Sequence, residues 1–187
     1  MSRNYWVTSD THFFHANSLD WEHDGIKCRG DRFANVEEMN QTMVDNWNSV
    51  VKPGDYVYHC GDVVMQSTKE EFQSLWGKLL GKKRLLLGNH DDVKYLAAGG
   101  FFSKIQYWKY FHEFGILLSH MPVHPRSFEP ASRFDKLGFV PLNVHGHLHS
   151  VPSPEGPYRN VSVEMTDYTP LNLEQIRDDY AKQRKEQ

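Results

Sequence analysis

Short apolar runs alternate with polar segments along most of the chain, and this alternation predicts a mixed α/β protein. Seven runs have the length of strands and end at turn-forming or polar residues. The strands are predicted over residues 4–9, 55–60, 84–87, 105–112, 115–119, 142–145 and 160–165. The runs at 105–112 and 115–119 are predicted to pair, with the turn near residues 113–115.

Apolar residues at helical spacing predict three helices, over residues 36–50, 68–79 and 173–185. In the first helix the apolar side chains recur every three or four positions, at Val36, Met39, Met43, Val44 and Trp47. Asn35 is placed to cap this helix, and Glu70 and Glu71 lie in the first turn of the second. Residues 11–35, 121–138 and 151–157 show no clear period or are rich in proline, so we predict loops there.

Candidate metal ligands follow the predicted strands directly, in five short motifs. In chain order the motifs are Asp10-Thr-His12, Gly61-Asp62, Gly88-Asn89-His90-Asp91, His120 and Gly146-His147-Leu148-His149. Open α/β sheets bind ligands where strand ends converge on one edge, so we expect these motifs to meet. Taken alone, each motif has a structural alternative, such as a turn for Gly61-Asp62 or a hydrogen-bonded polar group for His120.

Seven of these side chains suit two divalent cations that share one carboxylate. They are Asp10, His12, Asp62, Asn89, His120, His147 and His149. Two such cations, roughly 3.5–4 Å apart, bind phosphate oxygens and activate water, with Asp62 as the bridging carboxylate. Because residues two apart on an extended chain point the same way, Asp10 and His12 should reach one cation. His145 has the opposite parity to His147 and is assigned a structural role, whereas Gly146 would permit a close backbone approach.

Two further residues of the third motif are predicted to be catalytic. His90 follows Asn89 at once and therefore projects differently, so it can face substrate while Asn89 faces metal. We expect Asp91 to fix the tautomer of His90 and to raise its basicity.

The order and spacing of the five motifs resemble those of the calcineurin-like metallophosphoesterase superfamily. The resemblance extends from Asp10 to His149, about three quarters of the chain. Residues 8–15, 36–39, 46–48 and 160–164 are similar to a small single-domain branch found in bacteria and phages. The resemblance implies a four-layer α-β-β-α sandwich with two mixed β-sheets, in one domain over residues 1–187.

The same resemblance implies which residues hold each cation. One cation would take Asp10, His12, Asp62 and His149, and the other Asp62, Asn89, His120 and His147. An activated water would attack phosphorus in line, and protonated His90 would stabilise the developing charge or protonate the leaving oxygen. Mn²⁺ is the favoured ion, with iron, Ni²⁺ and Zn²⁺ as alternatives because the mixed ligand set suits all of them.

The loops over residues 13–35 and 121–138 are expected to rim the site and select the substrate. The side chains predicted to contact it are His15, Arg32, His124 and Arg126, and for His15 the alternative is to support the metal ligands. Arg29 and Arg133 lie in the same loops, where an arginine either grips a second phosphate or is a solvated surface group. Four aromatic residues either stack on a base or, as we favour, anchor the first loop to the core; they are Phe13, Phe14, Trp21 and Phe33.

A phosphodiester or nucleotide-type substrate is favoured, because the chain is small and shows no large cap domain. The alternatives are a phosphomonoesterase or pyrophosphatase on small metabolites, a nuclease, and a non-catalytic metal-binding scaffold. The net charge of −3 argues against a stable complex with nucleic acid but is compatible with nucleotides.

Cysteine usage and hydropathy give the remaining expectations. Cys28 and Cys60 form no CxxC motif, and Cys60 lies in an apolar run as a buried thiol. The first residues show no signal pattern, and no apolar stretch approaches ~20 residues. We therefore expect no membrane span and a cytoplasmic location.

Overall fold

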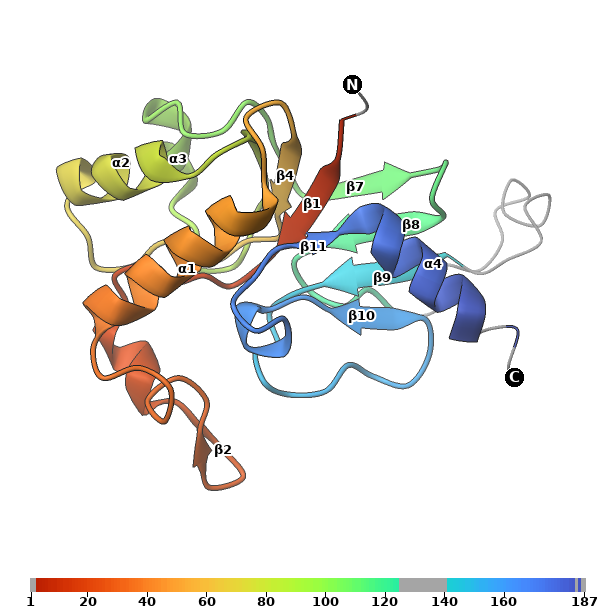
Figure 1. Ribbon diagram of the computed structural model, residues 1–187, viewed down its shortest axis with the longest axis horizontal. Helices are drawn as coiled ribbons and strands as arrows, with labels where there is room; N and C mark the ends of the chain where they lie inside the picture. The colour runs from red at the N-terminus through yellow and green to blue at the C-terminus, as the bar shows by residue number, and fades with distance from the viewer. Residues whose placement is uncertain (1–2, 125–140, 184, 186–187) are drawn as a thin grey trace.

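The computed structural model describes residues 3–124, 141–183 and 185, and nine of the strands in these residues form two mixed β-sheets (Figure 1). The larger sheet contains, in order, β11 (Leu171–Asn172), β1 (Tyr5–Thr8), β4 (Tyr56–His59), β5 (Lys82–Leu86) and β6 (Ile105–Gln106). The smaller sheet contains, in order, β10 (Tyr158–Asn160), β9 (Leu142–His145), β8 (Ile116–Ser119) and β7 (Trp108–Phe111). Only β11 and β7 pair antiparallel with their neighbours in these sheets. The predicted fold class is confirmed.

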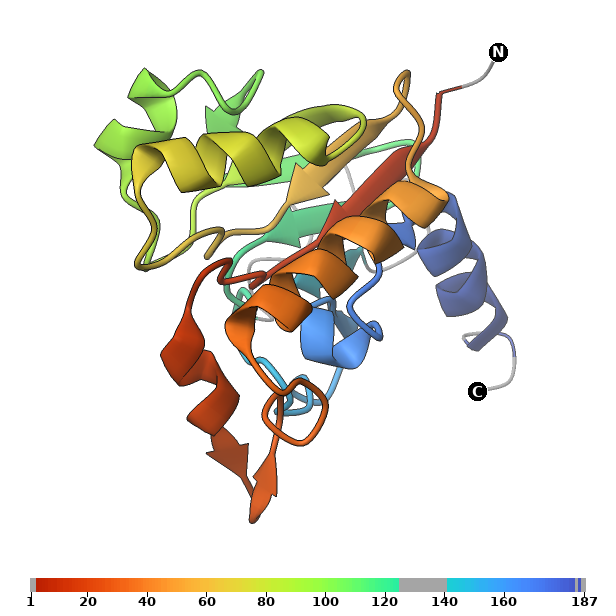
Figure 2. The same cartoon turned by 60° about the vertical axis from the view of Figure 1, so that its left-hand side comes forward.

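Three helices cover one face of the larger sheet (Figure 2): α1 (Val36–Val50), α2 (Lys69–Lys78) and α3 (Val93–Ala98). They pack on Val57 and Leu85, whereas Tyr58 and Leu86 belong to a second core between the two sheets. Successive residues of β4 and of β5 thus face different cores. Helix α4 (Leu173–Gln183) lies against β1 and β11. Within the described residues, no helix is long and apolar enough to cross a membrane.

Local signals set the starts of the helices. The predicted cap of α1 is confirmed, because Asn35 Oδ1 accepts a hydrogen bond from Glu38 N at 2.8 Å. At α2, Thr68 Oγ1 accepts from Glu71 N at 3.2 Å, while Glu71 Oε2 accepts from Thr68 N at 2.8 Å. This reciprocal arrangement is a capping box, and each such cap stabilises a helix by about 1 kcal/mol.

Residues 105–112 were predicted as one strand but form two strands in different sheets. β6 pairs with β5 in the larger sheet, and β7 pairs with β8 in the smaller one. The chain therefore changes sheet at Tyr107. The apolar pattern continues across this residue, so periodicity alone does not reveal the crossing.

The predicted strand over residues 160–165 is wrong beyond its first residue. β10 ends at Asn160, and Val163–Met165 form the 3-10 helix η4. Asn160 Oδ1 accepts a hydrogen bond from Ser162 N at 2.9 Å. This local side-chain bond gives the backbone an alternative to continued strand pairing.

Residues 11–35 contain more regular structure than the predicted loop. They include the 3-10 helix η1 (Ala16–Asp20) and a small hairpin of β2 (Glu22–His23) and β3 (Ile26–Lys27). The sequence pattern also does not predict α3 or β11, which have six and two residues. Elements this short do not develop a recognisable period.

Candidate metal centre

The five motifs lie at the carboxyl edge of the two sheets. The first candidate ligand of each motif follows its strand closely: Asp10 after β1, Asp62 after β4, Asn89 after β5, His120 after β8 and His147 after β9. His147 N donates a hydrogen bond to Asp10 Oδ2 at 2.9 Å, which ties the smaller sheet to the larger one. A Cβ at Gly146 would collide with Ser9 Oγ and the Asp10 carboxylate, so the predicted close approach at this glycine is confirmed.

Six of the seven predicted ligands form two groups, and within each group the ligand atoms lie within 4.8 Å of one another. One group is Asp10, His12 and His149, and the other is Asp62, His120 and His147. Asn89 adjoins the second group, because its Oδ1 lies 2.8 Å from His120 Nε2. The structure thus brings together all seven residues.

Asp62 lies between the two groups. Its Oδ2 is 3.6 Å from His12 Nε2 and 3.5 Å from His120 Nε2. Its Oδ1 accepts a hydrogen bond from His90 N at 2.9 Å, which holds the carboxylate in this orientation. One oxygen of Asp62 therefore faces an imidazole nitrogen from each group.

Buried atoms of the first group lack partners that a cation would supply. Asp10 Oδ1 and both ring nitrogens of His12 have no hydrogen-bond partner among the described residues. Buried polar atoms are normally paired, so these three atoms call for a ligand. Burial, reinforced by the positive charge of Arg29, lowers the pKa of His12 and keeps its imidazole neutral. A neutral imidazole beside a carboxylate fits a divalent metal ion.

The ligand atoms of the second group are also oriented to bind a cation. His120 Nδ1 lies 2.7 Å from the carbonyl oxygen of Cys60, so the ring proton belongs on Nδ1. Nε2 then presents its lone pair toward Asp62 and Asn89. Two acceptors, His120 Nε2 and Asn89 Oδ1, face each other, and a cation between them would stabilise the pair.

Five of the seven candidate ligands have left-handed backbone conformations. Their φ angles are 58° at Asp10, 44° at His12, 58° at Asp62, 68° at His147 and 50° at His149. Such a conformation costs of order 1–3 kcal/mol at a residue other than glycine and gathers at functional sites. The parity argument for Asp10 and His12 assumed an extended chain, so its premise is wrong, although both residues do lie in one group.

A buried ion pair supports His149 from behind. Glu164 Oε1 accepts hydrogen bonds from His149 Nδ1 at 3.0 Å and from Arg29 Nε at 2.8 Å. Arg29 is fully buried and also donates to the carbonyl oxygens of Asp10 and Thr11. Burial alone would raise the pKa of Glu164, but Arg29 and His149 hold it at about 2. Both alternatives predicted for Arg29, phosphate contact and solvent exposure, are therefore wrong.

Comparison with known proteins identifies the family of this site. A family model described as calcineurin-like phosphoesterase matches residues 3–184. The chain belongs to this family. It is a metal-dependent phosphoesterase, a hydrolase that acts on ester bonds, and its two groups of Asp and His indicate divalent metal ions.

Three proteins that are similar to this chain come from different organisms. The uncharacterized protein MJ1445 of Methanocaldococcus jannaschii is 34% identical over 182 residues, 93% of this chain and 89% of that protein. The gene 66 protein of Mycobacterium phage L5 is 29% identical over 79% of this chain and 78% of its own. The crystal structure of AQ665, a protein of unknown function from Aquifex aeolicus, superposes with a TM-score of 0.66 at 28% identity. That match covers 94% of this chain and 98% of AQ665.

In this phosphoesterase, Asp91 does not hold His90 as predicted. Its carboxylate accepts hydrogen bonds from three backbone amides, Gly88 N at 2.8 Å, Val63 N at 2.9 Å and Asp62 N at 3.1 Å. Asp91 therefore braces the two loops that carry Asp62 and Asn89. His90 is exposed, and its ring centroid lies 5.9 Å from that of His12, beside the first group.

Trp21 packs on the first group of the phosphoesterase site. Its ring centroid is 4.6 Å from that of His149 and 5.0 Å from that of His12, with edge contacts to both. The guanidinium carbon of Arg29 lies 5.3 Å from the same ring. Trp21 thus anchors the loop to candidate ligands, whereas Phe13 and Phe33 anchor it to the core as favoured.

The residues predicted to contact substrate have different surroundings. His15 lies beside the first group, with its ring centroid 5.6 Å from that of His12. Arg32 forms an ion pair with Asp167, and its guanidinium lies over the ring of Tyr168. His124 is exposed, and Arg126 lies outside the described residues. Contact of any of the four with substrate stays a prediction.

Two structural predictions close the account of the site. His145 is fully buried, and its ring nitrogens lie 2.8 Å from Gly146 O and 3.0 Å from Ser153 Oγ, in keeping with a structural role. Cys60 is fully buried, and both cysteines are free thiols. Burial raises the pKa of the Cys60 thiol, so it stays protonated.

Proposed function

We propose that this phosphoesterase uses two divalent metal ions to hydrolyse small phosphodiesters of the nucleotide type. The observation that carries the proposal is the position of Asp62 Oδ2, at 3.6 Å and 3.5 Å from one imidazole nitrogen of each group. A carboxylate oxygen at similar distances from both ligand groups can bind two metal ions at once. The two groups therefore suit one centre of two ions better than two independent metal sites.

The proposed ligands divide as the two groups do. Asp10, His12 and His149 hold one ion, His120, His147 and Asn89 hold the other, and Asp62 joins both. When bound, the two ions supply charge neutralisation for the phosphate and a water of lowered pKa as the nucleophile. Manganese is proposed because carboxylate, amide and imidazole ligands suit an ion of intermediate hardness.

His90 is proposed to donate a proton to the leaving oxygen. Its side chain is exposed at the edge of the site, while its backbone N–H is fixed to Asp62 Oδ1 at 2.9 Å. The backbone of His90 is therefore anchored to the bridging residue, and the exposed imidazole can reach a bound ester. Protonation of a poor leaving group by a placed side chain accelerates a reaction by about 10²–10⁴-fold.

Exposure of the site favours diesters. Asn89 and His90 are exposed, and His147 and His149 are half-buried, so the described residues leave one side of the two groups open. A diester carries a substituent on both sides of phosphorus and needs such room. A phosphomonoesterase remains the competing function, because the same ligand groups serve both reactions.

The test is hydrolysis of bis-p-nitrophenyl phosphate and p-nitrophenyl phosphate by metal-stripped protein, with and without added Mn²⁺. We expect Mn²⁺-dependent cleavage that is faster for the diester and is lost in Asp62→Asn. Asp55→Asn is the matched control, because Asp55 lies at the opposite end of the same sheet. Preference for the monoester would contradict the proposed substrate class, and full activity without metal would contradict the mechanism.

A further inference from the structure

Three apolar side chains stand exposed at one side of the metal centre. Of the large hydrophobic residues in the described segments, Tyr107 and Trp108 are the most exposed, at 70% and 67%, and Met121 is 45% exposed. We call these three residues the rim patch. The ring centroids of Tyr107 and Trp108 are 6.5 Å apart.

Strand register places the rim patch beside the second ligand group. Leu87 N donates to Gln106 O at 2.9 Å, so Tyr107 follows the end of β6 at the level of the loop that carries Asn89. Trp108 pairs with Ser119, the residue before His120. Paired residues have Cα atoms about 5.5 Å apart or less, and Met121 comes directly after His120. The patch therefore borders both Asn89 and His120.

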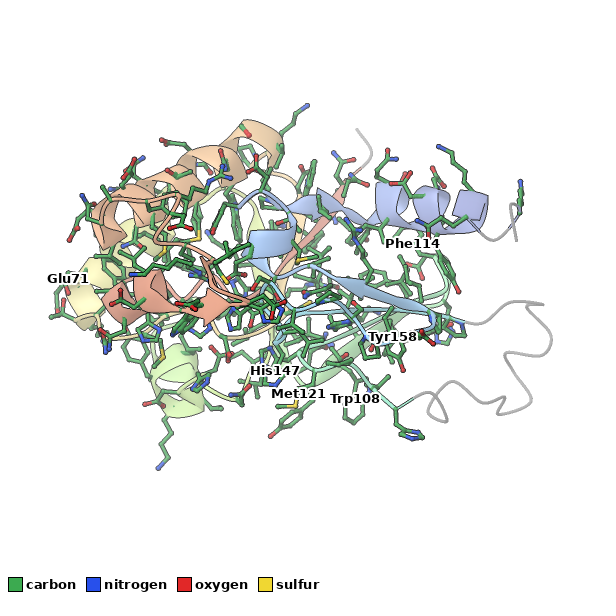
Figure 3. All side chains as sticks on the ribbon, turned by 90° about the horizontal axis from the view of Figure 1, so that it is seen from below. Glu71, Trp108, Phe114, Met121, His147 and Tyr158 are labelled. Atoms are coloured by element: carbon green, nitrogen blue, oxygen red, sulfur yellow. The ribbon has the colours of Figure 1, made fainter. Side chains whose placement is uncertain are left out.

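Hydrogen bonds connect the chain beneath the patch to its neighbours. Ser119 is buried, donates to Met121 O at 2.7 Å and accepts from Asn143 Nδ2 at 2.9 Å. Figure 3 shows Trp108 and Met121 along the same side of the molecule as His147. The strand pairing thus holds the backbone of Trp108 next to the residue that precedes His120, and its indole stands exposed there.

The size and chemistry of the rim patch indicate which kind of ligand it binds. Three side chains are too few for a stable protein interface, which takes about 20–30 residues on each side. The patch contains no charged side chain, so it does not suit a phosphate. A flat, neutral ring bound next to a phosphate matches both the aromatic surface and its position beside the strand ends that lead to Asn89 and His120.

We propose that Tyr107, Trp108 and Met121 bind the nucleobase of a nucleotide diester whose phosphate lies at the metal centre. This inference rests on the proposed function and narrows it to substrates that carry a base. Stacking on an aromatic ring tolerates every base, so the patch selects for a base without selecting among bases.

The test compares two diesters with the same leaving group. Thymidine 5′-(p-nitrophenyl phosphate) carries a base, whereas methyl p-nitrophenyl phosphate does not. In the Mn²⁺-loaded protein, Trp108→Ala should lower kcat/KM about tenfold for the thymidine ester and leave the methyl ester nearly unchanged. Trp108→Phe should retain most of the preference, because it keeps a ring. Leu80→Ala, at a similarly apolar surface residue of the opposite edge, should change neither.

Equal losses on both esters, or no loss on either, would overturn the inference. If the wild-type protein cleaves neither ester, the proposed function fails, and calorimetry of the Mn²⁺-loaded protein decides the role of the patch. Adenosine 5′-monophosphate should then bind about tenfold more tightly than ribose 5-phosphate, and Trp108→Ala should remove the difference. Equal affinity of the wild-type protein for the two compounds would contradict a base-binding patch.

Discussion

The two ends of strands β1 and β4 each carry a buried aspartate, but the two carboxylates differ in their hydrogen bonding. At the amino end, Asp55 is buried and accepts four hydrogen bonds, from Trp6 Nε1, Lys52 N and both nitrogens of Asn4. At the carboxyl end, Asp10 is equally buried, but its Oδ1 has no hydrogen-bond partner among the described residues. Asp10 and Asp62 also both have φ angles of 58°, in the left-handed region.

The difference shows what each end contributes. A carboxylate whose lone pairs all accept hydrogen bonds from the protein stabilises the folded chain and has no lone pair left for a metal ion. A buried oxygen without a partner, on a strained backbone, lowers stability unless a ligand completes it. The same sheet therefore has a structural end and a functional end, and substitutions at the two ends should have opposite consequences.

The largest predicted contrast is between Asp62→Asn and Asp55→Asn. Asp62→Asn should reduce diester hydrolysis about 10³-fold, because loss of the bridging charge removes several kcal/mol of transition-state stabilisation. Its metal-free melting temperature should change little, since asparagine keeps Oδ1 for His90 N and tolerates a left-handed φ. Asp55→Asn should instead lower the melting temperature and leave kcat/KM intact. Thermal melts and initial rates measure both, and parallel losses in the two variants would erase the contrast.

His90→Ala sharpens the contrast within the functional end, because His90 is exposed and is not a candidate ligand. The rate on a dinucleoside phosphate, whose leaving group is an alkoxide, should fall about 10²–10³-fold. The rate on bis-p-nitrophenyl phosphate should fall less than about tenfold, since nitrophenolate leaves without a proton. Steady-state rates on the two substrates give the ratio. Equal losses would assign His90 to positioning instead of proton donation.

Glu164→Gln tests whether the functional end depends on its buried support. Loss of the charge that faces His149 Nδ1 should weaken Mn²⁺ binding about 10–100-fold. The variant should also melt at a lower temperature, because Arg29 would stay buried without its charge partner. Calorimetric titration with Mn²⁺ measures the change in affinity, and a thermal melt of the metal-free protein measures the change in stability. Glu174→Gln, on the exposed face of α4, is the control for both. Unchanged affinity in a destabilised variant would confine Glu164 to a structural role.

Local signals explain which parts of the site and fold were predictable. Each candidate ligand follows an apolar run within the same short stretch of sequence, so strand end and ligand could be predicted together. The helix α1 and its Asn35 cap were predictable for the same reason. Arg29 and Glu164 are 135 residues apart, and no periodicity or motif connects two positions that only the folded sheets bring together. The change of sheet at Tyr107 and the left-handed backbone of the ligands likewise depend on tertiary packing.

The smallest predicted effect is the pH dependence of the stability that Asp55 provides at the structural, amino end of the strands. Burial alone would raise the pKa of Asp55, but hydrogen bonds from Trp6, Lys52 and Asn4 outweigh it and lower the pKa below 3.8. A carboxyl whose pKa is lower in the folded state stabilises the protein above its unfolded pKa and loses that contribution as pH falls through the folded value. The difference in unfolding free energy between wild type and Asp55→Asn should therefore be about 1–2 kcal/mol at pH 6 and shrink below about pH 4. Urea denaturation at pH 6, 4 and 3 measures it. A difference that stays constant with pH would mean that packing, and not the charge of Asp55, stabilises this end.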